Sequence, residues 1–212
     1  FTPRKISELE VLIEDIVDRL LDKLAEAGEV DFITEFAMAL PTEIISYMLG
    51  IPSEHRHRLR GFSLAILGVL DPVVSPERMA AGNAAVTEFA ELLTDLIAQR
   101  RANPDAAAQG EVLDSLIFGE VDGRALTHEE LIQNCIFLLN AGHETTTSLV
   151  GNAVAILLDN PDQHHRLKTD PALITTAVEE FLRVQSPLQI GNRMADANID
   201  LGDVVLPKGT YI

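Results

Sequence analysis

The apolar stretch between Thr127 and Pro161 constrains the fold of this chain more than any other part of it. Thr127 and Glu130 have the spacing of a capping box, and Pro161 ends the stretch because proline disfavours the α conformation of the residue before it. These signals predict one helix of about 32 residues, roughly 48 Å long at a rise of 1.5 Å per residue. Apolar side chains on nearly every face indicate that this helix is buried.

Polar residues interrupt the apolar stretch at Asn134, Asn140, His143 and Glu144. Such residues are rare in a membrane-spanning helix, so we expect the central helix of a soluble domain instead. The chain as a whole has 212 residues, 47% of them hydrophobic, which predicts a sizeable core in one large domain or two small ones. Its formal charge of −17 argues against nucleic acid or an anionic membrane as a partner.

The sequence Ala141-Gly142-His143-Glu144-Thr145-Thr146 lies in the middle of the predicted helix. A buried carboxylate without partners is costly, and Gly142 costs about 1 kcal/mol relative to alanine inside a helix. Unfavourable residues that cluster in a core helix indicate a functional site. The alternative is a structural arrangement, in which Glu144 pairs with a distant arginine and the threonines bond to the helix backbone.

The remaining sequence predicts a mainly α-helical chain. Helical spacing of apolar residues runs through a core over residues 7–185, and Pro41 is expected to kink or break the helix that contains it. Beyond Pro187 the pattern changes, and Gly202-Asp203 predicts the turn of a β-hairpin over 198–206. We therefore expect a small β-rich segment over residues 190–212.

Three motifs together resemble the cytochrome P-450 family. The first is Ala141-Gly142-His143-Glu144-Thr145-Thr146, which looks like the family's oxygen-activation motif on its long central helix. The second is Glu180-x-x-Arg183, on a helix shortly after it, where positions i and i+3 share a face. The third is the segment 186–193. The resemblance covers essentially the whole chain, and it implies an incomplete, single cytochrome P-450-like domain over residues 1–212.

The resemblance implies a bacterial haem-thiolate monooxygenase that binds haem b, activates O₂ and hydroxylates a small hydrophobic organic substrate. Thr145 would hydrogen-bond the bound dioxygen and order water, and Glu144 would relay protons from solvent. Ala141 and Gly142 are small, which would let the helix pass close over the haem. Phe137, one turn earlier, would face the substrate.

The resemblance assigns further roles after the central helix. Leu188 and Ile190 would face the substrate, and Arg193 would bind a haem propionate through its planar fork of donors. Glu180 and Arg183 would form a buried structural pair. A ferredoxin-type protein would supply electrons.

The haem ligand of the family is a cysteine in a C-terminal loop, which we expect beyond Ile212. The N-terminal part of the family's fold is also expected to be missing, so these 212 residues alone should be inactive. Cys135 is a poor substitute because it lies on the oxygen-side helix, roughly two turns before the motif. We thus expect no metal ligand in this chain. A single cysteine also excludes a disulfide framework and fits a reducing compartment, which predicts a cytoplasmic protein.

Two alternative functions remain at this stage. Glu54 and His57 form one Glu-x-x-His motif of the kind found in di-iron helical bundles, but that fold needs a second such motif and two further glutamates. The other alternative is a truncated or degenerate helical domain that binds a ligand without catalysis.

Overall fold

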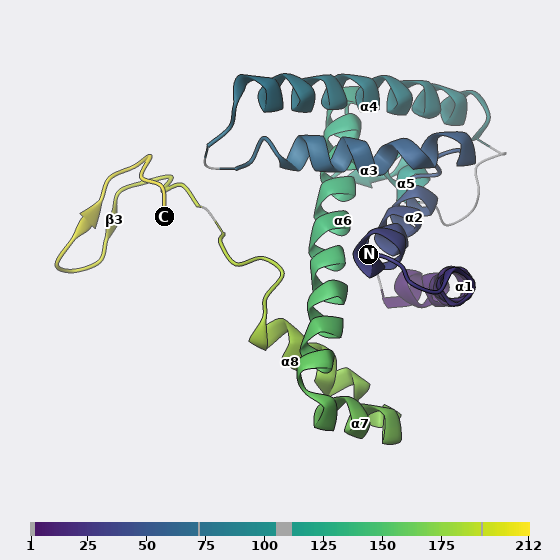
Figure 1. Ribbon diagram of the computed structural model, residues 1–212. Coiled ribbons are helices and arrows are strands. Elements are labelled where there is room, and N and C mark those ends of the chain that lie inside the picture. The colour runs from purple at the N-terminus through teal and green to yellow at the C-terminus, as the bar shows by residue number, and fades with distance from the viewer. Residues whose placement is uncertain (1–2, 72, 105–111, 192) are drawn as a thin grey trace.

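The computed structural model describes residues 3–71, 73–104, 112–191 and 193–212, and most of these residues are helical (Figure 1). The helices are α1 (Pro3–Ala27), η1 (Ile33–Ala37), α2 (Ala39–Met48), α3 (Ser53–Leu67), α4 (Pro76–Ala102), α5 (Val112–Phe118), α6 (His128–Asp159), α7 (Pro161–Thr169), η3 (Pro171–Leu173) and α8 (Ile174–Val184). The strands are β1 (Glu120–Val121), β2 (Arg124–Ala125), β3 (Ile199–Asp200) and β4 (Val205–Leu206). The predicted mainly α fold with a small β region is confirmed.

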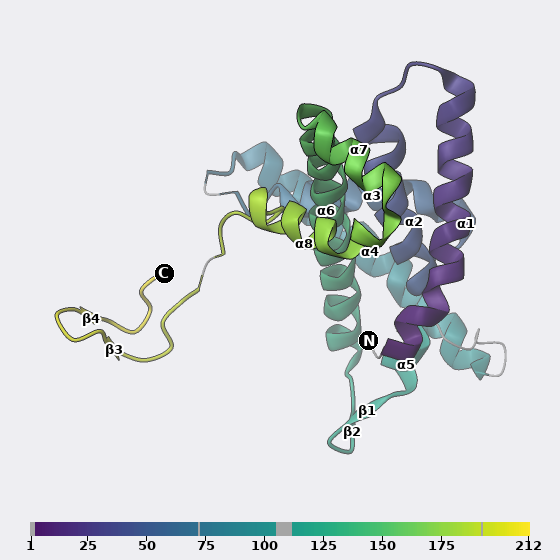
Figure 2. The same cartoon turned by 90° about the horizontal axis from the view of Figure 1, so that it is seen from below.

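Helix α6 is the central helix of the molecule, and α2, α3, α4, α5, η1, α7 and α8 contact it (Figures 1 and 2). Its 32 residues confirm the predicted length. The capping box is complete, because the Thr127 hydroxyl accepts from the Glu130 N–H and the Glu130 carboxylate accepts from the Thr127 N–H. Glu130 also receives two hydrogen bonds from Arg124, and these hold the pKa of its carboxyl at about 2. The helix ends at Asp159, just before Asn160 and Pro161.

Burial along α6 follows one stripe rather than the whole circumference. The buried residues include Leu131, Cys135, Leu139, His143 and Thr147, which recur every four residues and so share one face. The expectation of burial on every face was wrong, since Phe137 and Leu158 are exposed. The physical reason is that the elements in contact with α6 cover only part of its circumference, so that residues such as Phe137 have no neighbouring helix over them.

Helices α3 and α4 lie side by side and cross α6 (Figure 1). The rings of Phe62 and Phe89 stack between them, with centroids 5.4 Å apart. Both rings belong to the larger apolar cluster of the molecule, which also contains Leu131 and Leu139 of α6. This pair of helices is therefore fixed to the central helix through a continuous apolar core.

Helix α1 and the segment η1–α2 form a second packed unit beside α6, around the buried residues Ile16, Leu20, Phe36 and Leu40. The helical run is interrupted at Met38, where the π-helical turn η1 ends and α2 begins. Pro41 was expected to kink or break the helix that contains it; the interruption lies at Met38, and Pro41 itself lies in the first turn of α2. Proline is tolerated there because N–H groups in the first turn have no acceptor within the helix.

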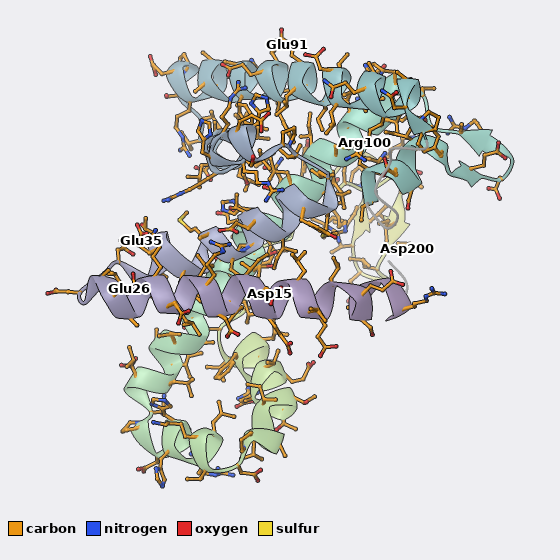
Figure 3. All side chains as sticks on the ribbon, turned by 90° about the vertical axis from the view of Figure 1, so that its right-hand side faces the viewer. Asp15, Glu26, Glu35, Glu91, Arg100 and Asp200 are labelled. Atoms are coloured by element: carbon orange, nitrogen blue, oxygen red, sulfur yellow. The ribbon has the colours of Figure 1, made fainter. Side chains whose placement is uncertain are left out.

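Acidic side chains account for the strongly negative charge, and several of them lie on outer surfaces. Figure 3 shows Glu91 on the outer side of α4 and Asp15 and Glu26 along α1. Arg100 instead points inward from α4 and donates to the carboxylate of Asp114 on α5, at 3.3 Å. Among the helices of the described residues, none has the length and apolar composition needed to cross a membrane.

Two short hairpins complete the structure. An Asp-Gly turn joins β1 to β2, with Asp122 and Gly123 both at positive φ (53° and 74°), as a type I′ turn requires. The hairpin predicted over 198–206 is confirmed by β3 and β4, in which Ile199 pairs with Leu206 and Gly202 has φ 92°. This second hairpin belongs to a C-terminal segment that extends away from the helices (Figures 1 and 2).

Candidate functional site

The motif residues lie near the middle of α6 and point in several directions, because successive residues in a helix are rotated by about 100°. His143 faces the core, whereas Ala141 and Glu144 are exposed. Gly142, Thr145 and Thr146 lie between these extremes. The motif therefore presents one group inward and a different set outward.

The open face of α6 carries Phe137, Ala141 and Thr145, which are four residues apart and so lie in one row. Phe137 is 67% exposed, an unusual exposure for a large apolar side chain in the middle of a helix. Its ring and the small Ala141 side chain make this row apolar, and Thr145 adds one hydroxyl at its end. We call Phe137, Ala141 and Thr145 the open row.

Two hollows flank the open row and share Leu138 of α6 and Met48 of α2. One, of about 320 Å³, lies against Phe137 and extends to Ile6, Leu9 and Val112. The other, of about 340 Å³, lies against Ala141 and Gly142 and extends to Pro41, Ile44 and Ile45. That α2 lines this region could not be predicted from the sequence, because contacts between distant segments leave no local pattern.

The Thr145 hydroxyl donates to the carbonyl of Ala141 at 2.7 Å, a bond from one turn of the helix to the previous one. Thr147 and Asn140 make similar bonds to His143 and Ile136. The hydroxyl proton of Thr145 is therefore engaged within the helix, whereas the oxygen lone pairs remain able to accept. Toward the open face, Thr145 can accept a hydrogen bond from a water molecule or another protonated group.

Gly142 contacts α2 rather than the open face. A Cβ atom at this position would lie 2.6 Å from Cδ1 and 3.1 Å from Cγ1 of Ile45, closer than van der Waals contact allows. The absence of a side chain is thus needed for α2 to pack against α6. The predicted approach of Gly142 to a haem stays a prediction, and Ala141 is the exposed small residue of the two.

We expect Gly142→Ala to destabilise the protein in the presence of Ile45 and to stabilise it in an Ile45→Ala background. The new methyl costs about 1–3 kcal/mol where it overpacks the core, whereas alanine gains about 1 kcal/mol over glycine in a helix. The measurement is urea unfolding of the complete product of the gene that encodes these 212 residues, called the gene product below.

Gly61 of α3 is the matched control for this experiment, because nothing lies within 4 Å of a Cβ added there. Gly61→Ala should stabilise the protein in both backgrounds. If Gly142→Ala changes the free energy of unfolding equally with Ile45 and with Ile45→Ala, the close contact between Gly142 and Ile45 is contradicted.

Glu180 and Arg183 are paired as predicted, but they are not buried. Arg183 donates from Nε and Nη2 to the two carboxylate oxygens of Glu180, each at 2.7 Å, which lowers the pKa of Glu180. The side chain of Glu180 is 57% exposed and that of Arg183 is 70% exposed, so the predicted burial was wrong. Helix α8 contacts α6. Among the described residues of α8 only Phe181 is buried, and Glu180 and Arg183 lie beside it on the helix surface.

The structure does not bring Leu188, Ile190 and Arg193 to the motif. All three are exposed and lie on the extended segment after α8, where Asn192 is outside the described residues. Arg193 pairs through its backbone with Ile212, at 2.9 and 2.8 Å. Their predicted contacts with substrate and haem therefore stay predictions.

Cys135 lies on the buried stripe of α6, away from the open row. Burial raises the pKa of its thiol to about 12, so the thiol stays protonated at neutral pH. Because the thiolate is the form that binds metals, Cys135 is poorly suited to hold iron. This agrees with the expectation that the ligand cysteine is not part of this chain.

His143 makes a contact that sequence reasoning missed. Its Nδ1 lies 2.9 Å from Oγ of Ser63 on α3, and both side chains are buried. Burial, and then the charge of Arg60, lower the pKa of His143 below its usual value, so the ring is neutral at neutral pH. The available signal was a polar residue on the apolar stripe, but the sequence alone does not identify its partner.

One histidine signal of the gene product should titrate at lower pH than an exposed histidine. The unfolded chain takes up this proton near pH 6.5, and the folded chain takes it up only at lower pH. The contribution of His143 to stability is thus complete above about pH 6.5 and is lost as the pH falls through the lowered pKa. Proton NMR of the imidazole signals tests this, with His143→Gln to assign the signal. A signal from His143 that titrates near pH 6.5, the value for a histidine in an unfolded chain, would contradict it.

Comparison with known proteins identifies the family. A sequence profile described as Cytochrome P450 matches residues 1–172. The chain belongs to the cytochrome P450 family. Because the profile spans the open row and the motif, both can be considered as parts of a P450 fold.

Several bacterial P450 proteins are similar along the whole chain. Cytochrome P450 107B1 of Saccharopolyspora erythraea is 40% identical over 213 residues, and a vitamin D(3) 25-hydroxylase of Pseudonocardia autotrophica is 38% identical over 214 residues. In each case the match includes 100% of this chain and 50% of the relative. The chain thus spans about half the length of the curated P450 relatives it matches.

Solved P450 structures confirm the arrangement of the helices. P450BioI, in complex with an acyl carrier protein ligated to hexadec-9Z-enoic acid, is 33% identical and superposes with a TM-score of 0.90, covering 100% of this chain and 54% of that one. The ligand-free P450 TbtJ1 gives a TM-score of 0.89 at 34% identity, covering 100% and 55%. The di-iron alternative gains no support, since within the described ranges no three potential metal ligands gather.

Proposed function

We propose that this chain forms the oxygen-activating side of a haem-dependent monooxygenase, with residues 1–212 as part of one P450 domain. The observation that carries the proposal is the open row, which places Thr145 of the motif beside Phe137 and Ala141 on an uncovered face of α6. A motif that served only packing would face the core, as His143 and Thr147 do.

The open row fits haem b by shape and chemistry. A flat, largely apolar group requires an apolar surface without long side chains at its centre, and Ala141 provides this between Phe137 and Thr145. Haem, when bound, would provide the site at which O₂ is reduced by electrons from the donor protein and one oxygen atom is transferred to the substrate. Arg193 is the candidate partner of a propionate. The thiolate ligand is proposed to come from the gene product outside these residues, since Cys135 is buried and protonated.

Within this proposal Thr145 positions water and Glu144 supplies protons. The Thr145 oxygen would accept a hydrogen bond from a water molecule on the open face, while its hydroxyl donates to the carbonyl oxygen of Ala141. Glu144, the preceding residue, is exposed and so exchanges protons with solvent. Proton transfer requires groups within hydrogen-bond reach, directly or through one water, and these neighbouring side chains can be linked in that way.

The substrate is proposed to be a small hydrophobic organic molecule that contacts Phe137, Leu188 and Ile190. The exposure of all three side chains supports this, because each is an apolar group available to a ligand. A ferredoxin-type electron donor and a cytoplasmic location complete the proposal. They are supported by the bacterial relatives and by the single cysteine, which fits a reducing compartment.

Turnover in ¹⁸O₂ tests the proposed function. Apolar small molecules that shift the haem absorption spectrum of the gene product are first selected, and the best of them is incubated with a ferredoxin, its reductase and labelled oxygen. We expect one labelled atom in the product. An unlabelled product, or a gene product that binds no haem, would exclude monooxygenase activity.

A further inference from the structure

One buried polar contact links α6 to α3 in the middle of the motif. His143 of α6 is 1% exposed, Ser63 of α3 is fully buried, and Nδ1 of the histidine lies 2.9 Å from the serine oxygen. The two residues are 80 positions apart in sequence. Either the ring N–H donates to the serine or the serine hydroxyl donates to the ring, and in both cases the bond holds the two helices together.

The surroundings of this contact are apolar. Leu59 and Phe62 of α3 and Leu139 of α6 belong to one core cluster. Apolar contacts are not directional, so they bring the helices together without fixing how α6 is rotated about its axis. A hydrogen bond is directional, and it therefore restricts that rotation at the motif.

Among the residues that the structure describes, the histidine ring has no second hydrogen-bond partner that could replace Ser63. Its Nε2 is buried without a hydrogen bond among the described residues. Protonation would place a second N–H in the same apolar surroundings, near Arg60 of α3, whose charge also opposes it. The neutral ring bonded to Ser63 is thus the favoured state, and loss of the serine hydroxyl leaves a buried ring nitrogen unsatisfied.

We propose that His143 is a positioning residue, whose hydrogen bond to Ser63 fixes the rotation of α6 and so the directions in which Glu144 and Thr145 face. Because successive residues are offset by about 100°, a fixed His143 determines the direction of the next two side chains. This inference rests on the proposed function for the roles of Glu144 and Thr145. The link between the helices does not depend on it.

A double-mutant cycle in the gene product tests the link. Ser63→Ala, His143→Phe and the double variant are compared by hydrogen exchange of peptides covering 57–67 and 139–147. Each single variant should speed exchange in both peptides, by about two- to tenfold for the loss of one hydrogen bond. The double variant should exchange no faster than the faster single variant, because both changes remove the same bond.

Thr147→Val is the matched control, because Thr147 is buried on the same stripe and its hydroxyl bonds within α6, to the carbonyl of His143. It should speed exchange in the α6 peptide alone. The link would be overturned if the effects of Ser63→Ala and His143→Phe on the exchange rates added up in the double variant. It would also be overturned if either single variant left the exchange rate of the α3 peptide unchanged. Should His143→Phe fail to fold, Ser63→Ala still decides, since it removes a single oxygen atom.

A second measurement tests positioning. Ser63→Ala, far from the open row in sequence and buried, should raise the fraction of consumed O₂ that appears as hydrogen peroxide by at least about twofold, in line with the loss of one hydrogen bond. Unchanged peroxide with faster exchange would overturn the positioning role. Failure of the proposed function is recognised separately, as a gene product that consumes no oxygen while the exchange results still hold.

Discussion

Replacement of Thr145 by alanine should make hydrogen peroxide the main product of the oxygen that the gene product consumes. The variant loses the hydroxyl that donates to the Ala141 carbonyl and that we propose to accept from water on the open face, with little change in bulk. Haem and substrate binding need no hydroxyl and should persist, and electrons should still flow. Without a water ordered by this hydroxyl, proton delivery for cleavage of the O–O bond would slow, and oxygen reduced by two electrons would leave with two protons as hydrogen peroxide. We expect product per O₂ to fall at least about tenfold, within the range general acid–base groups contribute.

The measurement is product formed per O₂ consumed, with peroxide assayed in the same sample. Thr146→Ala is the matched control: it removes the same group from the adjacent residue, which lines the hollow toward α2 instead. Glu144→Gln should differ from both, giving slow turnover because proton supply rather than water position is damaged. If Thr145→Ala forms as much product per O₂ consumed as the unaltered protein, Thr145 has no part in the mechanism.

Phe89→Ala should cause the largest loss of stability, about 3–5 kcal/mol for the truncation of a buried aromatic side chain. Phe89 is fully buried and stacks on Phe62, so its removal leaves a cavity between α4 and α3. Urea unfolding of the gene product measures the loss. Val86→Ala, on a partly exposed position of the same helix, is the control and should cost much less.

A loss below about 1 kcal/mol in Phe89→Ala would show that α4 is not anchored where the structure places it, since a truncated core phenylalanine normally costs several times more. The result also matters for the motif, because Phe62 precedes Ser63 on α3. Loosening of the aromatic stack should therefore reach the contact between Ser63 and His143.

Local signals in the sequence predicted the helices well. The ends of α6 followed from Thr127, Glu130 and Pro161, because capping and proline geometry depend on neighbouring residues alone. The hairpin of β3 and β4 followed from Gly202 in the same way. The pairing of Glu180 with Arg183 was also predictable, since three-residue spacing puts them on one helical face.

Features that depend on distant segments were not predictable from the sequence alone. Gly142 carries no sign that Ile45 occupies the space beside it, and His143 carries no sign of Ser63, because both contacts arise only when α2 and α3 pack against α6. The exposure of Glu180 and Arg183 differed from expectation for the same reason. Pairing is a local property, but burial depends on what covers the helix.

The absorption spectrum of the reduced, carbon monoxide-bound protein tests the central claim most directly, that this chain is the oxygen side of an enzyme whose thiolate comes from elsewhere in the gene product. The spectrum of a thiolate-ligated haem is predicted for the gene product and for its Cys135→Ser variant, and not for the 212 residues alone. Absence of that spectrum from the gene product, or its loss in Cys135→Ser, would contradict the account.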